Sequence, residues 1–215
     1  MKEVIPASKS SRIRSFGAIA AIVISAFLLI LSISCSGKKD TFVPFPYGVV
    51  PSLTGTAVTI PELSLQFSPP TGWAQLDSTR LAEFRKLLGN TELQLKFYHV
   101  HLLDAYMDSL TGCLAYVARI EEEYTPFPDV VKRYHDFLAP RTGVKALDEN
   151  LYLINDLNVY HFMVRSITTV NYKLLGEIAP TKRYMIEYVM SSESYMSVEP
   201  AVLASIASLK RAAEK

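Results

Sequence analysis

An unbroken apolar run near the N-terminus constrains this chain more than any other feature. Residues 16–33 read FGAIAAIVISAFLLILSI without a charged side chain, and Lys9, Arg12 and Arg14 precede them. A basic stretch followed by an apolar one is the pattern of a secretory signal. A helix that is apolar all round has no polar face to turn toward water. The run therefore predicts that residues 36–215 lie outside the cytoplasm.

The segment that ends this run predicts a lipid attachment site. LSISC, residues 31–35, resembles the lipobox of bacterial lipoproteins, in which a small residue precedes a cysteine that becomes the lipid-modified start of the mature chain. Ser34 suits the position before the cut, while Ser32 stands where the family prefers leucine. We therefore expect a signal peptide over residues 1–34 and lipidation of Cys35.

Two other fates of the N-terminus remain open at this point. The apolar run is close to the length of about 20 residues that spans a bilayer, so it is long enough to stay uncleaved as an anchor. Ordinary signal cleavage after Ser34 is the other alternative. With lipid or an uncleaved anchor, the chain is expected to be held at a membrane of the bacterial cell envelope, with its domain periplasmic or surface-exposed.

The chain after the cysteine divides into a lead and a domain. Residues 35–62 contain repeated prolines and glycines, which break helices and long strands, and they read as a flexible tether. From residue 63 amphipathic patterns begin, and residues 63–212 are long enough to bury one core. We expect one domain over 63–212.

The predicted elements of this domain alternate between strands and helices. They are a strand over 63–67, a helix from Asp77 or Ser78 to about Leu88, a hairpin over 102–121 turning at Gly112, a helix within 126–140, strands near 157–169, 171–178 and 183–191, and a helix over 198–212 capped by Ser197. The last helix carries an apolar stripe of Val202, Leu203, Ile206 and Leu209. This order predicts an α+β fold with a central antiparallel sheet covered by helices.

Three stretches resemble the PsbP-like family, which includes a eukaryotic Ran-binding protein and many bacterial lipoproteins. They are LQFSPPTGW at the start of the domain, DAYMDSLTGCLAYVARI in the hairpin and RYMIEYVMSSESYMSVEPAVLASIASLK at the end. The resemblance covers about residues 63–212 and implies a central antiparallel sheet sandwiched between helices. It also implies an accessory or binding role, because the family has no shared catalytic residues to carry over.

Common catalytic and nucleotide-binding motifs are absent from the sequence. The nine glycines are too far apart for a GxGxxG or Walker loop, and CxxC, HExxH and GxSxG do not occur. The net charge of +1 gives no basic surplus for nucleic acid. We therefore predict no catalytic residues, no cofactor, no nucleotide and no nucleic-acid partner.

One group of residues offers an alternative as a metal site. His99 and His101 share one face if their segment is a strand, and Asp104 or Asp108 lies nearby in sequence. Two imidazoles and a carboxylate are ligands that zinc accepts. The competing interpretation is a pair of partly exposed histidines without a metal, and we favour it.

Cys113 and His161 are expected to have structural roles. With Cys35 lipidated, Cys113 has no disulfide partner and is best explained as a small buried apolar residue. His161 faces away from Tyr160 and Phe162, so we expect it on the less buried face of the sheet.

Three functions remain open from the sequence. The first is an envelope lipoprotein with an accessory or protein-binding role, attached to the membrane through its lipid. The second is an envelope enzyme or metal protein with a site around His99, His101 and Asp104. The third is a structural subunit of an envelope complex.

Overall fold

The computed structural model describes residues 40–89, 100–122, 124–140 and 143–213. Thr41–Lys215 form one compact unit, and Met1–Asp40 are assigned to another. The predicted signal peptide and Cys35 therefore lie outside the described residues. Among the described helices, none has the length and apolar character needed to cross a membrane.

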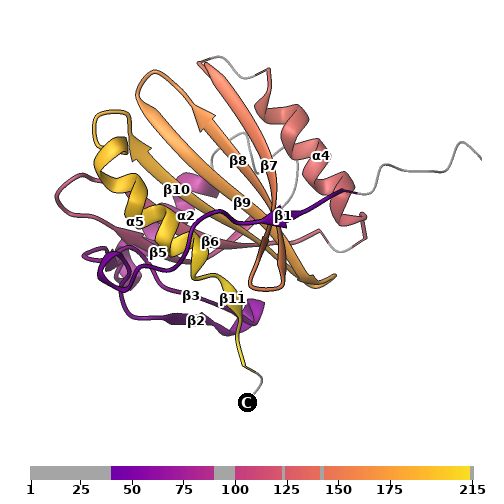
Figure 1. Ribbon diagram of the computed structural model, residues 1–215, viewed down its shortest axis with the longest axis horizontal. Helices are drawn as coiled ribbons and strands as arrows, with labels where there is room; N and C mark the ends of the chain where they lie inside the picture. The colour runs from indigo at the N-terminus through magenta and orange to yellow at the C-terminus, as the bar shows by residue number, and fades with distance from the viewer. Residues whose placement is uncertain (1–39, 90–99, 123, 141–142, 214–215) are drawn as a thin grey trace, which may run out of the picture. The chain divides into compact units, whose positions relative to one another are not determined.

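Within the described residues, an eight-stranded sheet runs through the domain in the order β1-β7-β8-β9-β10-β6-β5-β4 (Figure 1). The strands are β1 (Val43–Pro44), β4 (Ala74–Gln75), β5 (Val100–Met107), β6 (Leu114–Ile120), β7 (Ala146–Ile154), β8 (Leu157–Arg165), β9 (Thr169–Ala179) and β10 (Lys182–Ser191). Neighbours in this order pair antiparallel among the described strands, except that β1 pairs parallel with β7. The expected α+β class is confirmed, with a mixed sheet.

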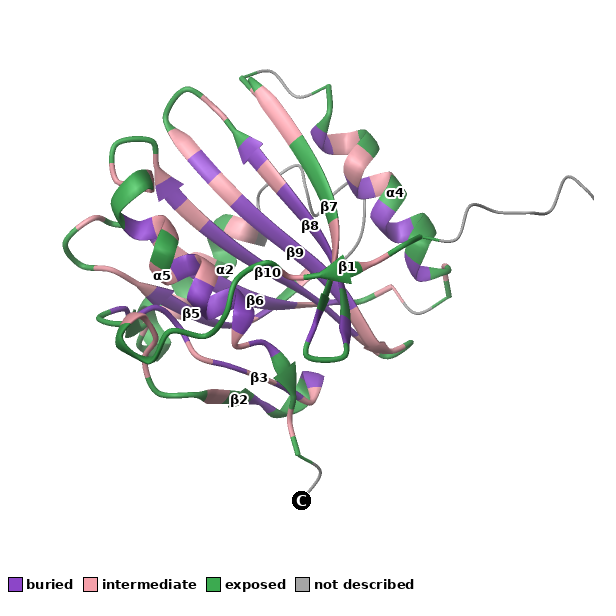
Figure 2. Cartoon of the chain, viewed as in Figure 1, coloured by how far each residue is buried: buried purple, intermediate pink, exposed green. Residues whose placement is uncertain are grey.

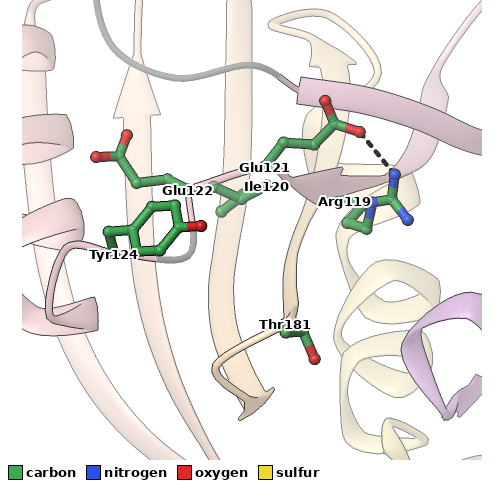
Figure 3. Close-up of a pocket in the computed structure, with 6 residues that line it drawn as sticks. All are labelled: Arg119, Ile120, Glu121, Glu122, Tyr124 and Thr181. Atoms are coloured by element: carbon green, nitrogen blue, oxygen red, sulfur yellow. Dashed lines mark hydrogen bonds and ion pairs between the residues drawn. The ribbon is translucent and has the colours of Figure 1, made fainter.

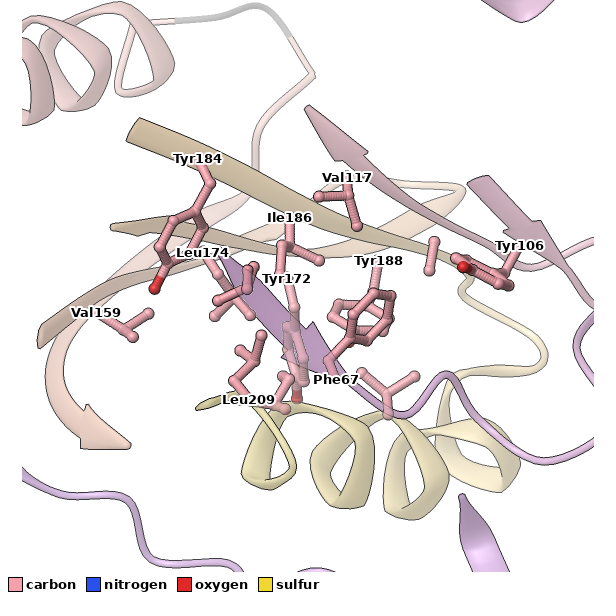
Figure 4. Close-up of a cluster of buried hydrophobic side chains, with 14 of the residues drawn as sticks. Phe67, Tyr106, Val117, Val159, Tyr172, Leu174, Tyr184, Ile186, Tyr188 and Leu209 are labelled. Carbon is pink, nitrogen blue, oxygen red and sulfur yellow. The ribbon is translucent and has the colours of Figure 1, made fainter. Parts of the chain in front are cut away.

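Both faces of the sheet are covered, and each covering layer buries its own hydrophobic cluster. One face packs against α2 (Ser78–Gly89) and α4 (Phe127–Leu138). The other packs against α5 (Tyr195–Ala207) and a smaller sheet of β2 (Val58–Ile60), β3 (Leu65–Phe67) and β11 (Lys210–Arg211). Figure 4 shows side chains of β9 and β10 meeting Phe67 and Leu209 in this second cluster.

Local sequence accounts for several of these elements. Alternation along β10 sends Tyr184, Ile186 and Tyr188 into the cluster beneath α5. The backbone N–H of Arg80 donates to Asp77 Oδ1 at 2.9 Å, which caps the start of α2 as the sequence predicts. Gly112 has φ +70° at the predicted hairpin turn, a conformation that glycine adopts without strain.

The predicted set of elements needs two corrections. The strand β7 was not among the predicted elements, although it is a full member of the sheet. The last helix begins at Tyr195, before the predicted cap at Ser197, and ends at Ala207. Beyond it, Lys210 and Arg211 pair with β3 as a strand, so the chain leaves the helix earlier than predicted.

The predicted tether also differs from the structure in its described part. We call residues 41–57 the strap. Its strand β1 pairs with β7, and it continues through a 3₁₀ helix, Pro51–Leu53, toward β2. Ile60, just beyond the strap, is buried in the core. The folded unit therefore begins at Thr41 and not at residue 63.

A glycine in β9 provides a test of the core beneath α5. Gly176 lies directly opposite Tyr184 of β10, and a Cβ added to Gly176 would lie 2.2 Å from the Tyr184 Cζ and hydroxyl oxygen. Because Tyr184 is completely buried, its ring has little room to move. We expect Gly176→Ala to lower the free energy of unfolding by about 1–3 kcal/mol, measured by denaturant titration.

Gly48 supplies the matched control for this substitution. No atom lies within 4 Å of a Cβ added there, and the residue is exposed. Gly48→Ala should therefore leave stability within about 0.5 kcal/mol of the parent. Equal unfolding midpoints for both variants would contradict the packing of Tyr184 over Gly176.

Candidate functional site

Asp104, the aspartate of the alternative metal site, forms hydrogen bonds that join two strands. His99 lies outside the described residues, and His101 is exposed on β5. Gln75 Nε2 donates to both oxygens of buried Asp104, at 3.0 and 2.9 Å. The Tyr106 hydroxyl also donates to Asp104 Oδ2, at 2.5 Å. Asp104 thereby ties edge strand β4 to β5, with both oxygens already accepting protein hydrogen bonds.

Asp108, the other acidic residue considered for the metal site, stabilises the hairpin turn. Asp108 accepts hydrogen bonds from the Thr111 hydroxyl at 2.6 Å and from the Leu110 backbone at 3.0 Å. These bonds, the Thr111 bond first, hold the pKa of Asp108 below its usual value. No group of three histidine, cysteine or acidic residues suited to a metal occurs in the described part of the chain.

Cys113 and His161 are both buried. Cys113 is a free thiol packed in the core beneath α5, which agrees with its predicted role as a small apolar residue. His161 is 6% exposed, so its predicted place on a less buried face is wrong. The centroid of the His161 ring lies 5.0 Å from the ring centroid of Tyr172 and 5.7 Å from that of Tyr152. Neither nitrogen of the His161 ring has a hydrogen-bond partner.

Burial of His161 predicts a pH dependence of stability. Desolvation lowers the pKa of His161 to about 4 from its ordinary 6.5, so the folded chain keeps the ring neutral. Between these values the unfolded chain binds a proton that the folded chain does not. The free energy of unfolding therefore has its full value above pH 6.5 and falls by about 2–3 kcal/mol as the pH drops to 4.

Denaturant titrations at pH 7, 5 and 4 measure this effect. Carboxylates titrate in the same range, so the informative quantity is the difference between the parent and His161→Phe. The free energy of unfolding of His161→Phe should depend less steeply on pH than that of the parent. His135→Phe is the matched control, since His135 is half-buried at the surface of α4. Identical pH profiles for the parent and His161→Phe would contradict the prediction.

A buried ion pair on the face beneath α2 and α4 was missed by the sequence analysis. Lys173 Nζ contacts Glu187 Oε1, and both side chains are 6% exposed. The Tyr116 hydroxyl donates to Glu187 Oε2 at 2.5 Å, and Asn171 Nδ2 donates to Oε1 at 3.1 Å. Register places Lys173, Glu187 and Tyr116 in one row across β9, β10 and β6. The arrangement satisfies a buried carboxylate and locks these strands together.

A second polar cluster joins β9 to α5. The Tyr172 and Tyr195 hydroxyls both donate to Glu199 Oε1, and the two hydroxyl oxygens lie 3.0 Å apart. Burial and the bond to Glu199 raise the pKa of Tyr172 above its ordinary value. Both phenols therefore stay protonated donors at neutral pH, which suits a role in holding the helix on the sheet.

A surface pocket of about 450 Å³ lies at the end of β6, and Figure 3 shows the residues that line it. Its lining residues are Arg119, Ile120, Glu121, Glu122, Tyr124 and Thr181. Arg119 forms an ion pair with Glu121 at 2.6 Å. Glu122 accepts hydrogen bonds from the Arg133 guanidinium at 2.8 Å and from the Thr125 hydroxyl at 2.6 Å. Its acidic groups are thus engaged by neighbouring protein donors. The lining carries one cation and two carboxylates, and each carboxylate is paired with an arginine.

The strap forms an exposed surface of a different chemistry. Residues 41–61 contain no charged side chain. Phe45 packs on Tyr152 of β7 with ring centroids 5.0 Å apart, whereas Val43, Tyr47 and Val49 are half exposed. Figure 2 shows the strap as a mostly exposed segment on the side of the domain that α5 covers. The lack of charge in this run is a sequence signal for such an apolar surface, but the prolines of the run favoured its interpretation as a tether.

Comparison with known proteins gives one structural likeness to report. No protein-family model matches the sequence, and no curated protein matches it. The structure is similar to the solution structure of cyanobacterial PsbP, CyanoP, from Synechocystis sp. PCC 6803. The match has 12% identity and a TM-score of 0.44, and covers 81% of this chain and 99% of that one. The matched protein bears the name of the family that the sequence resembles, but at these values the likeness carries no conclusion about function.

Proposed function

We propose that this chain is a membrane-anchored accessory protein of the bacterial cell envelope, with a non-catalytic binding domain outside the cytoplasm. Lipid on Cys35 is the proposed anchor. The domain recruits or stabilises a protein partner at the membrane, and the chain itself performs no chemistry.

The short lead between the anchor and the fold carries this proposal. Residues 36–40 alone separate Cys35 from Thr41, where the folded unit begins. Even a fully extended chain of this length spans only about 20 Å. An attached domain would therefore remain close to the bilayer, which suits a protein that acts on membrane-bound partners.

The buried ionisable groups support a binding role over catalysis. Asp104, Lys173 and Glu187 each contact protein groups that hold strands of the sheet together. A side chain used in this way contributes to stability and is not positioned to exchange protons with a substrate.

Replacing Cys35 with serine tests the proposed anchoring. A serine has no thiol for lipid transfer, so the variant should accumulate as a larger, unprocessed precursor. Immunoblots of membrane fractions from cells that express the parent or Cys35→Ser compare the two sizes. Cys113→Ser is the control, because that buried thiol should not affect processing. Parent-sized, membrane-attached Cys35→Ser protein would contradict lipidation.

A further inference from the structure

Exposed apolar side chains concentrate on and beside the strap. Of the large hydrophobic residues that are exposed in the described part of the chain, half belong to this surface. They are Val43, Tyr47, Val49, Val50 and Leu153. Leu153 belongs with the strap because it lies opposite Pro44 in the β1–β7 pairing. Clustered exposed apolar residues mark an interaction surface, whereas scattered ones do not.

The position of the strap in the chain indicates what covers this surface. The strap starts at Thr41, directly after the lead from Cys35, and Val43 follows two residues later. With Cys35 at a bilayer, the strap is the first part of the domain that can reach lipid. An uncleaved anchor ending at residue 33 would place the strap in the same neighbourhood.

Charge next to the strap fits a lipid headgroup layer. Val49 lines a depression of about 520 Å³ together with Lys210, Arg211 and one acidic residue, Asp156. Lys38 and Lys39 add basic charge in the lead. Apolar and aromatic side chains bordered by lysine and arginine are typical of surfaces that lie in the interface of anionic membranes.

We propose that the strap docks on the bilayer surface, with Tyr47, Val49 and Val50 in the headgroup region and Lys210 and Arg211 facing anionic lipids. This inference rests on the proposed membrane attachment. The intrinsic affinity of so small a surface is low, but the anchor raises the effective concentration of lipid around it. Docking fixes the orientation of the domain, so that the strap faces lipid and α2, which covers the opposite face of the sheet, faces away.

Fluorescence quenching by brominated lipids tests this orientation. A chain from Cys35 to Lys215 retains the whole folded unit, and its Cys35 thiol can be coupled to maleimide lipid in phosphatidylglycerol-containing vesicles. This coupling does not depend on bacterial lipidation, so a failure of the proposed function does not affect it. Tyr47→Trp places a probe on the strap, and Leu87→Trp places the matched control at an exposed position on α2, on the other face of the sheet.

We expect brominated lipid to reduce the emission added by Tyr47→Trp and to leave that added by Leu87→Trp unchanged. The parent, with its buried Trp73, supplies the baseline. Adding Val49→Asp and Val50→Asp should abolish the quenching without shifting the melting midpoint, because both side chains are exposed. Unquenched Tyr47→Trp, or equal quenching at both positions, would overturn the proposal. A concentration-dependent blue shift of Tyr47→Trp without vesicles would assign the strap to a second copy and also overturn it.

Discussion

Lys173→Met is expected to lower the free energy of unfolding by about 3–5 kcal/mol, because it leaves Glu187 buried without its cation. Both side chains are 6% exposed, so water cannot replace the lost ammonium group. The Tyr116 hydroxyl and the Asn171 amide would remain as donors to the carboxylate. Neither donor carries a full charge, so they do not replace the cation. Denaturant titration at pH 7 measures the decrease in the free energy of unfolding.

Two further variants make this result specific to the buried pair. The double variant Lys173→Met/Glu187→Leu removes both charges, and its stability should return to within about 1 kcal/mol of the parent or exceed it. Lys132→Met removes an exposed cation from its pair with Asp136 on α4 and should leave the midpoint unchanged. A Lys173→Met protein as stable as Lys132→Met would contradict the buried ion pair.

Ile206→Ala is expected to lower the free energy of unfolding by about 2–5 kcal/mol, since the side chain is 0% exposed in the cluster beneath α5. The neighbouring contacts leave little freedom for collapse into the cavity. Ser205 donates to the Ser68 carbonyl at 2.6 Å and contacts the Tyr188 hydroxyl at 2.8 Å, so α5 is held at a fixed distance from the sheet. Thermal melts of the domain measure the effect.

The opposing interpretation of this helix is a free docking stripe for a partner. Under that interpretation Ile206→Ala would weaken only association and leave the isolated domain as stable as before. Met196→Ala is the matched control on the same helix, because Met196 is 76% exposed. Melting midpoints that coincide for the two variants would contradict the structural role of the helix.

Local signals were sufficient to predict the covering helices and the hairpin. Asp77 capped α2 as expected, prolines bounded α4, and Gly112 turned the β5–β6 hairpin. These features depend on residues close together in sequence, where capping and turn preferences act directly. Their agreement with the hydrophobic pattern explains why the α+β class could be predicted without a structure.

Strand β7 and the strap were missed because they lie at one edge of the sheet. Asp148, Glu149 and Asn150 interrupt the apolar pattern of β7, and all three are exposed there. Prolines predict a break in a strand, yet Pro44 lies in edge strand β1, where its missing N–H leaves no ladder bond unmade on the open side. Edge positions weaken the periodic signal that strand prediction needs.

The buried ion pair depended on a register that the sequence does not specify. The pairing shifts between Lys182 and Arg183, and that irregularity places Glu187 opposite Lys173. A one-residue slip exchanges the two faces of a strand, so the pair cannot be derived from strand limits alone. The alternative metal site illustrates how little closeness in sequence says about contacts between side chains. Asp104 lies near His101 in sequence, but its carboxylate is occupied by Gln75 and Tyr106.

The mass of the intact protein extracted from its own membrane is the most direct test of the central claim, that a lipid on Cys35 holds this domain at the bilayer. We predict a chain that begins at Cys35 and carries the added mass of a lipid on this first residue. An unmodified chain that begins elsewhere, or one that retains residues 1–34, would contradict it.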